Sequence, residues 1–159
     1  MTRFHPVGRR PLDGGNADGR YCQVPQDEYL EHSNNEKFII LQIEDPEPLD
    51  ELDEIAQVKG YDMLFFGPGD FSHSIGDPGN FSNPRLTEAR KMIAETALKY
   101  GKFAGTVGSL SNVNELMGMG YSFINIGADV IFLAEGYKKI ISTLHAMPSP
   151  KNKSIYSGE

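Results

Sequence analysis

The chain has 159 residues, of which 39% are hydrophobic and 23% charged, with a formal net charge of −7. This composition is typical of a globular protein and excludes a largely disordered chain, which would have fewer apolar residues. The acidic excess argues against nucleic acid as a partner, because phosphate binding needs clustered Lys and Arg. No apolar run approaches the ~20 residues of a membrane helix, and the N-terminus lacks the apolar core of a signal peptide. We therefore expect a cytoplasmic protein with no membrane partner.

The segment before the first apolar run is predicted to be a loop followed by a short helix. Residues 1–19 are rich in Gly, Pro, Arg and Asp, which favours irregular structure. A helix is predicted over residues 25–34, because Pro25 suits a first-turn position. Cys22 is the only cysteine, so an internal disulfide and a thiolate metal cluster are both excluded.

Four copies of a strand-then-helix pattern follow. Short, continuous apolar runs predict buried parallel strands at residues 38–43, 63–66, 103–107 and 123–126. Apolar residues at helical spacing predict helices between Asp45 and Gly60, from Pro84 to Gly101, around residues 113–117 and over residues 129–144. A long Gly-rich loop is predicted from residue 67 to 83, and a disordered tail over residues 147–159.

This alternation predicts an α/β fold with parallel strands joined by right-handed crossovers. A complete (β/α)8 barrel needs ~250 residues and eight such units. The sequence therefore fits two architectures, which are half of a barrel and a small open sheet with helices on both faces. In both, functional residues gather where the strands end.

Carboxylates stand at two of these strand ends. Glu44 follows the first strand and Asp70 follows the second. Two carboxylates from neighbouring strands can bind a hard divalent cation and leave positions open for water or substrate. By itself Glu44 fits a capping or surface role better, and its pairing with Asp70 is what favours a metal site. Asp45 is expected to cap the following helix instead.

The loop Gly67-Pro68-Gly69-Asp70 is a candidate substrate contact. Glycines allow the backbone to approach a ligand and to point N–H groups at an anion. The N–H groups of Gly69 and Asp70 are therefore candidates for holding a substrate carboxylate, although an ordinary turn explains the same residues. The histidines are scattered and none of them has zinc-ligand spacing.

Several of these segments together resemble the HpcH/HpaI aldolases, relatives of the citrate lyase β subunit. The resemblance is carried by residues 42–44, 62–72, 101–102 and 127–129, and the opening at residues 3–10 resembles the segment after the family's fourth barrel strand. It implies that residues 1–146 form the C-terminal half, four βα units, of a (β/α)8 TIM barrel. The separation between Gln42-Ile43-Glu44 and the Gly-Pro-x-Asp-x-Ser loop is the most specific part of the likeness.

The resemblance also implies an activity and roles for individual residues. The family consists of metal-dependent (class II) aldolases, carbon–carbon lyases that act on 2-oxo acids such as 4-hydroxy-2-oxo acids and release pyruvate. Its cofactor is Mg²⁺, Mn²⁺ or Co²⁺, for which Glu44 and Asp70 match the ligands. The N–H groups of Gly69 and Asp70 match the contacts to the pyruvate carboxylate, and Gln42 matches a residue beside the bound keto acid.

Two departures from the family pattern limit what the resemblance implies. The family has glycine where Pro11 follows Arg10. Its general-base histidine, the aspartate partner of that histidine and an arginine come from the first half of the barrel, and no histidine here matches the base. We therefore expect a metal and pyruvate half-site in a homo-oligomer, or in a complex with a missing N-terminal half-barrel.

Two other functions fit the sequence. One is a non-catalytic metal- and carboxylate-binding module, or a remnant that has lost turnover. The other is an open-sheet phosphate or nucleotide binder that uses Gly108 and Gly127 in phosphate loops.

Overall fold

The computed structural model describes residues 2–146, and the predicted disordered tail at residues 147–159 lies outside them. The chain divides into two compact units, Met1–Asn125 and Ile126–Glu159. The first contains almost all of the sheet and the helices that pack on it. The second contains the last helix.

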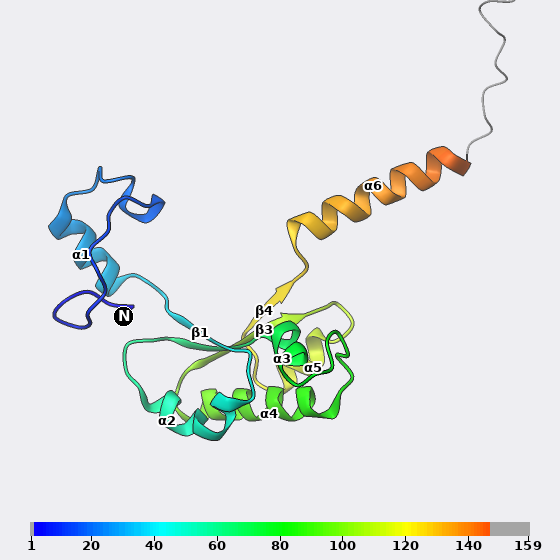
Figure 1. Cartoon of the computed structure of the whole chain (residues 1–159), viewed down its shortest axis with the longest axis horizontal. Helices are drawn as coiled ribbons and strands as arrows, with labels where there is room; N and C mark the ends of the chain where they lie inside the picture. Colours follow the sequence, from blue (N-terminus) through cyan, green and yellow to red (C-terminus); the bar gives the residue numbers. More distant parts are fainter. Residues whose placement is uncertain (1, 147–159) are drawn as a thin grey trace, which may run out of the picture. The chain divides into compact units, whose positions relative to one another are not determined.

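The sheet consists of four strands in the order β1-β2-β3-β4, which is also their order in the chain (Figure 1). The strands are β1 (Ile40–Ile43), β2 (Met63–Phe66), β3 (Phe103–Gly108) and β4 (Phe123–Ile126). β2 pairs in parallel with both β1 and β3. A doubly wound sheet reverses its strand order at a switch point, whereas these strands advance without reversal. The structure therefore confirms the α/β half-barrel and not the open sheet with helices on both faces.

The helices lie where the sequence predicts them except at three places, one of which is a short 3₁₀ turn inside residues 1–19, the segment expected to be a loop. They are η1 (Ala17–Gly19), α1 (Gln26–Asn35), η2 (Glu47–Glu51), α2 (Leu52–Gln57), α3 (Pro68–Ser74), α4 (Pro84–Lys99), α5 (Val113–Gly118) and α6 (Asp129–Ala146). The single helix expected after Asp45 begins as the 3₁₀ turn η2 and continues as α2 from Leu52. The loop expected at residues 67–83 contains the helix α3.

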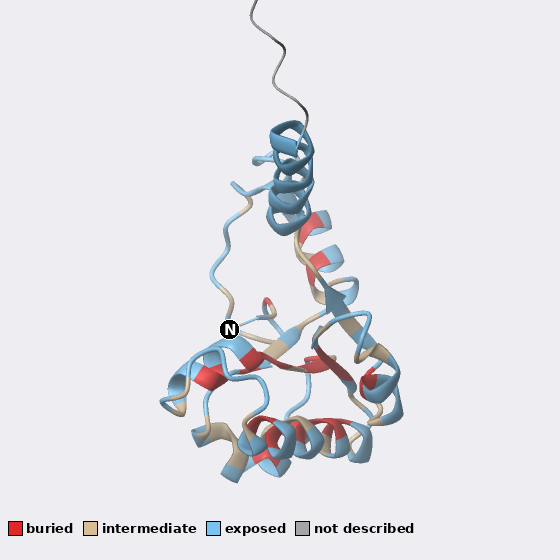
Figure 2. Ribbon diagram, turned by 90° about the vertical axis from the view of Figure 1, so that its right-hand side faces the viewer, coloured by how far each residue is buried: buried red, intermediate tan, exposed pale blue. Residues whose placement is uncertain are grey.

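The hydrophobic core lies between one face of the sheet and the helices α2 and α4, which lie on the same side of it (Figure 1). α4 begins at Pro84, where the Asn83 side chain accepts a hydrogen bond of 3.0 Å from the Arg85 N–H. Its apolar stripe faces the sheet, as the buried positions in Figure 2 show. The buried side chains that meet there include Leu64, Phe66, Ala104, Leu86, Ile93, Ala94 and Ala97.

The opposite face of the sheet is apolar and exposed. Phe38, Phe103 and Phe123 are 51%, 54% and 47% exposed, although continuous apolar strands are expected to be buried on both faces. The Phe38 and Phe103 ring centroids lie 5.7 Å apart, and those of Phe65 and Phe123 lie 6.3 Å apart. In a closed barrel this face lines the packed interior. We call it the inner face.

The second unit contains α6, whose first N–H groups are partly satisfied by Asp129. The Asp129 carboxylate accepts a hydrogen bond of 2.7 Å from the Val130 N–H. Within residues 2–146, no helix combines the length and the apolar character needed to span a membrane. The cytoplasmic location stays a prediction.

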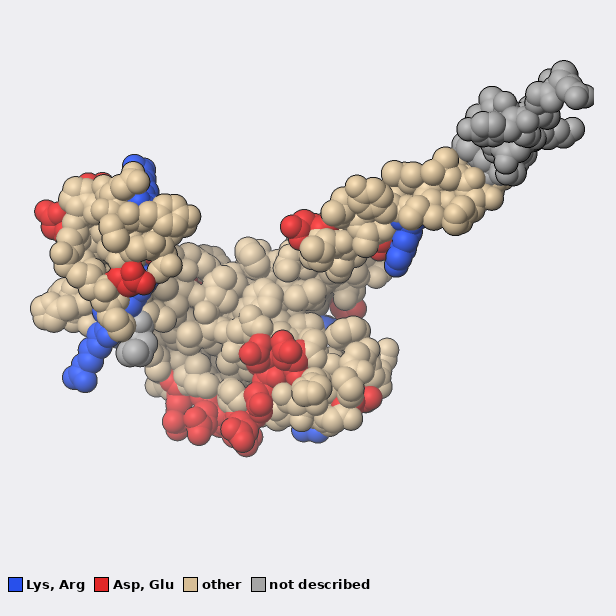
Figure 3. Space-filling model, turned by 45° about the horizontal axis from the view of Figure 1, so that its top comes forward, with Lys and Arg blue, Asp and Glu red and all other residues tan. Residues whose placement is uncertain are grey.

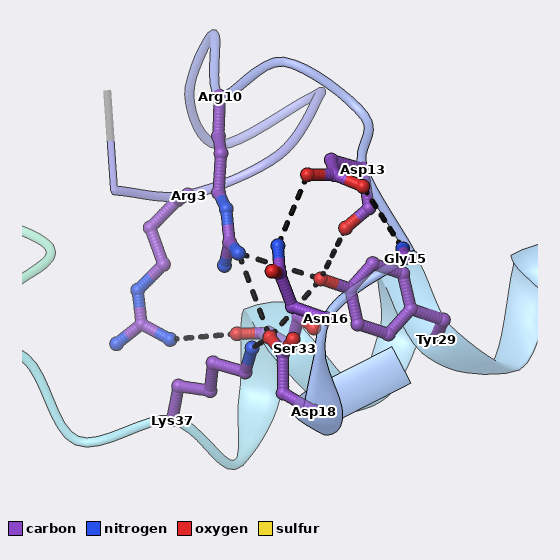
Figure 4. A network of polar contacts seen from close by, with 9 residues as sticks. All are labelled: Arg3, Arg10, Asp13, Gly15, Asn16, Asp18, Tyr29, Ser33 and Lys37. Atoms are coloured by element: carbon purple, nitrogen blue, oxygen red, sulfur yellow. Dashed lines mark hydrogen bonds and ion pairs between the residues drawn. The ribbon is translucent and has the colours of Figure 1, made fainter. Parts of the chain in front are cut away.

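The N-terminal segment has a small core and a polar network of its own (Figure 4). Phe4 and Tyr29 are buried and their rings pack edge to face, with centroids 5.6 Å apart. The Tyr29 hydroxyl lies 3.1 Å from an Asp18 carboxylate oxygen and 3.3 Å from the Arg10 guanidinium. Lys37 forms an ion pair with the same Asp18 oxygen. Asp18 thus connects the loop before α1 to the residue that leads into β1.

We expect the Asp18 carboxylate to stabilise the fold in a pH-dependent way. The pKa of Asp18 is lowered from 3.8 to about 2, mainly by the hydrogen bond from Lys37 and also by Tyr29 and Arg10, against the opposing effect of burial. Because the folded pKa is depressed, this stabilisation is present above pH 3.8 and is lost as the pH falls towards 2. Lys37→Met should return the pKa towards 3.8, as measured by NMR titration of the carboxyl carbon.

The control for this titration is Lys91→Met, which removes an exposed ion pair with Glu95 and should leave the Asp18 pKa unchanged. An Asp18 pKa that stays near 2 in Lys37→Met would contradict the assignment of Lys37 as the main cause.

Candidate metal and substrate site

Parallel pairing brings the ends of β1 and β2 to the same edge of the sheet. Ile43 lies opposite Phe66, and the Gly67 N–H donates a hydrogen bond of 2.9 Å to the Ile43 carbonyl. Glu44, the next residue after β1, therefore stands beside Gly67. The pairing of Glu44 with Asp70 as ligands of one metal ion stays a prediction.

Gln42 and Glu44 form the first contact of the site. They are two residues apart along an extended segment, so their side chains point to the same face. The buried Ile43 between them points to the core, which places Gln42 and Glu44 on the inner-face side. The Gln42 side-chain amide donates a hydrogen bond to a Glu44 carboxylate oxygen. The amide thereby orients the carboxylate before any ligand binds.

Gly67 lies against both of these side chains. A Cβ atom at this position would stand 3.0 Å from Gln42 Nε2, 3.1 Å from Glu44 Cβ and 3.4 Å from Glu44 Oε2. The absence of a side chain at Gly67 is therefore what lets the pair lie close to the end of β2. Its φ of −97° is accessible to other residues, so the requirement is one of space and not of backbone freedom.

The helix α3 carries the second half of the site. Pro68 takes the first helical position, where its missing N–H has no cost, and Phe71 is buried with its ring 5.3 Å from that of Phe66. These contacts explain why residues 68–74 form a helix, although Gly67, Pro68 and Gly69 favour a turn. Gly69 and Asp70 lie exposed in the first turn, at the same edge of the sheet as Glu44.

The oxygen ligands available at this edge suit a hard divalent cation. Glu44 and Asp70 supply carboxylate oxygens, which such cations prefer. Within residues 2–146 no cluster of three or more His, Cys, Asp and Glu side chains is present, so a cation here would have two protein carboxylates and complete its coordination from water or substrate. Figure 3 shows a group of Asp and Glu side chains on one face of the part of the molecule that carries the sheet.

Two serines near the site were not assigned a role from the sequence. Ser72 is fully buried, and Ser74 Oγ lies 3.4 Å from the Glu44 carbonyl oxygen. The sequence feature that could have pointed to Ser72 was its position in the Gly-Pro-x-Asp-x-Ser segment. Its burial depends on the loop from Ile75 to Asn83, which no local pattern places against α3.

Arg10 lies in the N-terminal network and not among these residues. Its guanidinium stands 4.7 Å from the centre of the Phe4 ring and 3.5 Å from an Asp18 carboxylate oxygen. Arg10 therefore packs within its own segment.

The two glycines considered for phosphate loops have packing roles instead. A Cβ at Gly108 would stand 2.7 Å from both Ile124 and Leu116, and one at Gly127 would stand 2.4 Å from the Phe132 ring. Close approach of apolar side chains explains both glycines, and nothing at either position favours the nucleotide-binding hypothesis.

The strand order, the one-sided core and the carboxylates at the strand ends define the chain as part of a (β/α)8 barrel. The family model for HpcH/HpaI aldolase/citrate lyase matches residues 1–135. The chain belongs to this family.

Named relatives agree with this assignment. The chain is 30% identical to a 5-keto-4-deoxy-D-glucarate aldolase of Klebsiella pneumoniae, over 87% of this chain and 56% of the relative. It is 30% identical to a hydroxypyruvate/pyruvate aldolase of Deinococcus radiodurans, over 98% of this chain and 58% of the relative. The solved HpcH/HpaI aldolase of Desulfitobacterium hafniense superposes with a TM-score of 0.75 at 25% identity, covering 92% of this chain and 57% of that one. The chain thus spans little more than half the length of these relatives.

We expect Gly67→Ala to disturb the Gln42–Glu44 pair. The added methyl group lies too close to both side chains, and overpacking of this kind costs about 1–3 kcal/mol in unfolding free energy. Urea unfolding measures that loss, and the Gln42 side-chain amide resonances should shift in the same variant.

The matched control is Gly118→Ala, because a Cβ at Gly118 meets no atom within 4 Å. Its unfolding free energy should be unchanged or slightly higher, since alanine favours a helix. Equal stability of the Gly67 variant and the wild type would show that the pair is not confined by Gly67.

Proposed function

We propose that this chain supplies the metal- and 2-oxo-acid-binding half of an aldolase, a carbon–carbon lyase whose substrates are 2-oxo acids such as 4-hydroxy-2-oxo acids. One observation carries the proposal. A carboxylate held by a neighbouring amide, Glu44 with Gln42, lies at the same sheet edge as the exposed Asp70 of α3. Membership of an aldolase family and the two named relatives support the choice of reaction.

Glu44 and Asp70 are the proposed ligands of a divalent metal ion, Mg²⁺, Mn²⁺ or Co²⁺. Bound there, the ion supplies Lewis-acid stabilisation of the negative charge that develops on a keto oxygen when the adjacent carbon–carbon bond breaks. Gln42 restrains the Glu44 carboxylate through its hydrogen bond, which lowers the entropy lost on ligation.

The first turn of α3 is the proposed contact for the substrate carboxylate. The N–H groups of Gly69 and Asp70 have no intrahelical acceptor at this position of a helix. They are therefore available to donate to an anion such as the carboxylate of pyruvate. Gln42 is placed to border the keto end of the same molecule, because it contacts Glu44 directly.

A base is missing from the residues that match the family. The only histidine near the site, His73, is exposed in the last turn of α3, and it matches no base in the family. This observation favours a second candidate function, a non-catalytic module that binds metal and carboxylate. The two candidates share the same ligands and differ in turnover.

The exposed inner face supports a proposal for how the half-site would be completed. Its exposed phenylalanines and the unpaired outer edges of β1 and β4 favour association with another chain. The proposed partner is a set of four further βα units, which would close an eight-stranded barrel and bury this face. A homo-oligomer is the alternative, in which a second copy covers it.

We expect one Mn²⁺ site in isothermal titration calorimetry. Glu44→Gln and Asp70→Asn each remove a charged ligand while retaining the shape of the side chain, so each should weaken binding by at least 10-fold, about 1.4 kcal/mol. Asp45→Asn is the control. Asp45 is adjacent to Glu44, but its carboxylate accepts a hydrogen bond of 3.2 Å from the Glu47 N–H and is not a proposed ligand. Wild-type affinity in both ligand variants would rule out the assignment.

We expect the 159-residue chain alone not to release pyruvate from 4-hydroxy-2-oxo acids. A positioned base contributes about 10²–10⁴-fold to such reactions, and binding without one gives affinity without rate. A coupled lactate dehydrogenase assay should show no cleavage above that of the free metal.

Mixing with the first four βα units of a relative, supplied as a separate chain, should restore cleavage, and sedimentation of the mixture should show the complex. The control is the same mixture with Glu44→Gln. Efficient pyruvate release by the chain alone would contradict the expectation that this chain lacks a general base. His73 would then be the first residue to test as that base.

A further inference from the structure

Ser72 makes two hydrogen bonds in a fully buried position. Its hydroxyl donates to the Gly69 carbonyl at 2.7 Å and accepts from the Gly79 N–H at 2.9 Å. Its relative exposure is 0%, in a core where neighbouring Phe71 packs on the sheet. One hydroxyl thereby joins the first turn of α3 to the middle of the loop that follows it.

The second of these bonds separates Ser72 from an ordinary helical serine. Serines in helices often donate to a carbonyl three or four residues earlier, and that bond alone carries little information. The bond from Gly79 comes from outside the helix. It is supported by a bond of 2.9 Å from the Asp77 N–H to the Ser72 carbonyl and by Asp77 itself, whose carboxylate accepts from Asn83 at 2.7 Å.

Nothing outside α3 packs against the side-chain position of Gly69. A Cβ at Gly69 would meet no atom within 4 Å, so no side chain from another element lies against this face of the residue. Glycine also has more accessible backbone conformations than any other residue. The hydrogen bond to its carbonyl therefore adds a link from the Gly69–Asp70 turn, through buried Ser72, to the loop at Gly79.

We propose that Ser72 is a positioning residue, which presets the Gly69–Asp70 turn for the ligands of the site. This inference rests on the proposed function, because it assigns Ser72 a role in binding at that same site. Ser72 touches neither metal nor substrate. It acts by fixing the carbonyl of Gly69, and with it the direction of the Asp70 side chain that follows.

The test uses Ser72→Ala in the full chain and has two measurements. The first is the Mn²⁺ Kd from calorimetry, which should rise about 3- to 10-fold, the effect of losing one hydrogen bond. The second is independent of metal. The backbone order parameters of Gly69 and Asp70 from ¹⁵N relaxation should fall, because the turn becomes mobile on the ps–ns timescale.

The control is Ile93→Val, which removes one methyl group from a fully buried site on α4 and lowers the melting temperature by a comparable amount. It should leave both the Kd and the order parameters at their wild-type values. Ser72→Cys, whose thiol is a weak donor and acceptor, repeats the test if the alanine variant does not fold.

Wild-type order parameters and Kd in the Ser72 variants would overturn the inference. Mn²⁺ binding that is weakened equally in Ile93→Val and in Ser72→Ala would also overturn it. The effect of Ser72 on binding would then follow from a general loss of fold stability. If the wild-type chain itself binds no Mn²⁺, the proposed metal site fails first, and the inference fails with it.

Discussion

The parallel pairing of β1 with β2 is the constraint on which the proposed site depends. It aligns Ile43 with Phe66, and so it brings Glu44 beside Gly67 and places α3 at the same edge. Gln42 and Glu44 belong to the end of β1 and Asp70 to α3 after β2, and they share this edge because parallel strands end together. A register shift of one residue would turn Gln42 and Glu44 into the core and bring Ile43 to the inner face.

The second consequence of this sheet is its unequal burial. One face packs on α4 and forms the core, whereas the inner face exposes three phenylalanines that a closed barrel would bury. The apolar character of both faces is what parallel strands need when both are covered. The same feature therefore explains the continuous apolar runs in the sequence and the proposed need for a partner that carries further βα units.

Loop contacts then determine how well the site is ordered. Gly67 gives the edge its space, whereas no side chain from another element packs against the side-chain position of Gly69. The buried hydroxyl of Ser72 and the Asp77 network link the turn at Gly69 to the loop after α3. Space and rigidity at the site thus come from different residues, which single-residue variants can separate.

The four strands and most helices were predictable from local patterns, and so were Glu44 and Asp70 as strand-end carboxylates, because periodicity and strand-end position are properties of neighbouring residues. Choosing a half-barrel over an open sheet needed the strand order, which no local pattern contains. The helix α3 was missed because burial of Phe71 against Phe66 outweighs the turn preference of its glycines and proline. The hydrogen bond from the Gly79 N–H to the Ser72 hydroxyl was decided by the tertiary structure alone, since it forms only when the loop after α3 folds back onto that helix.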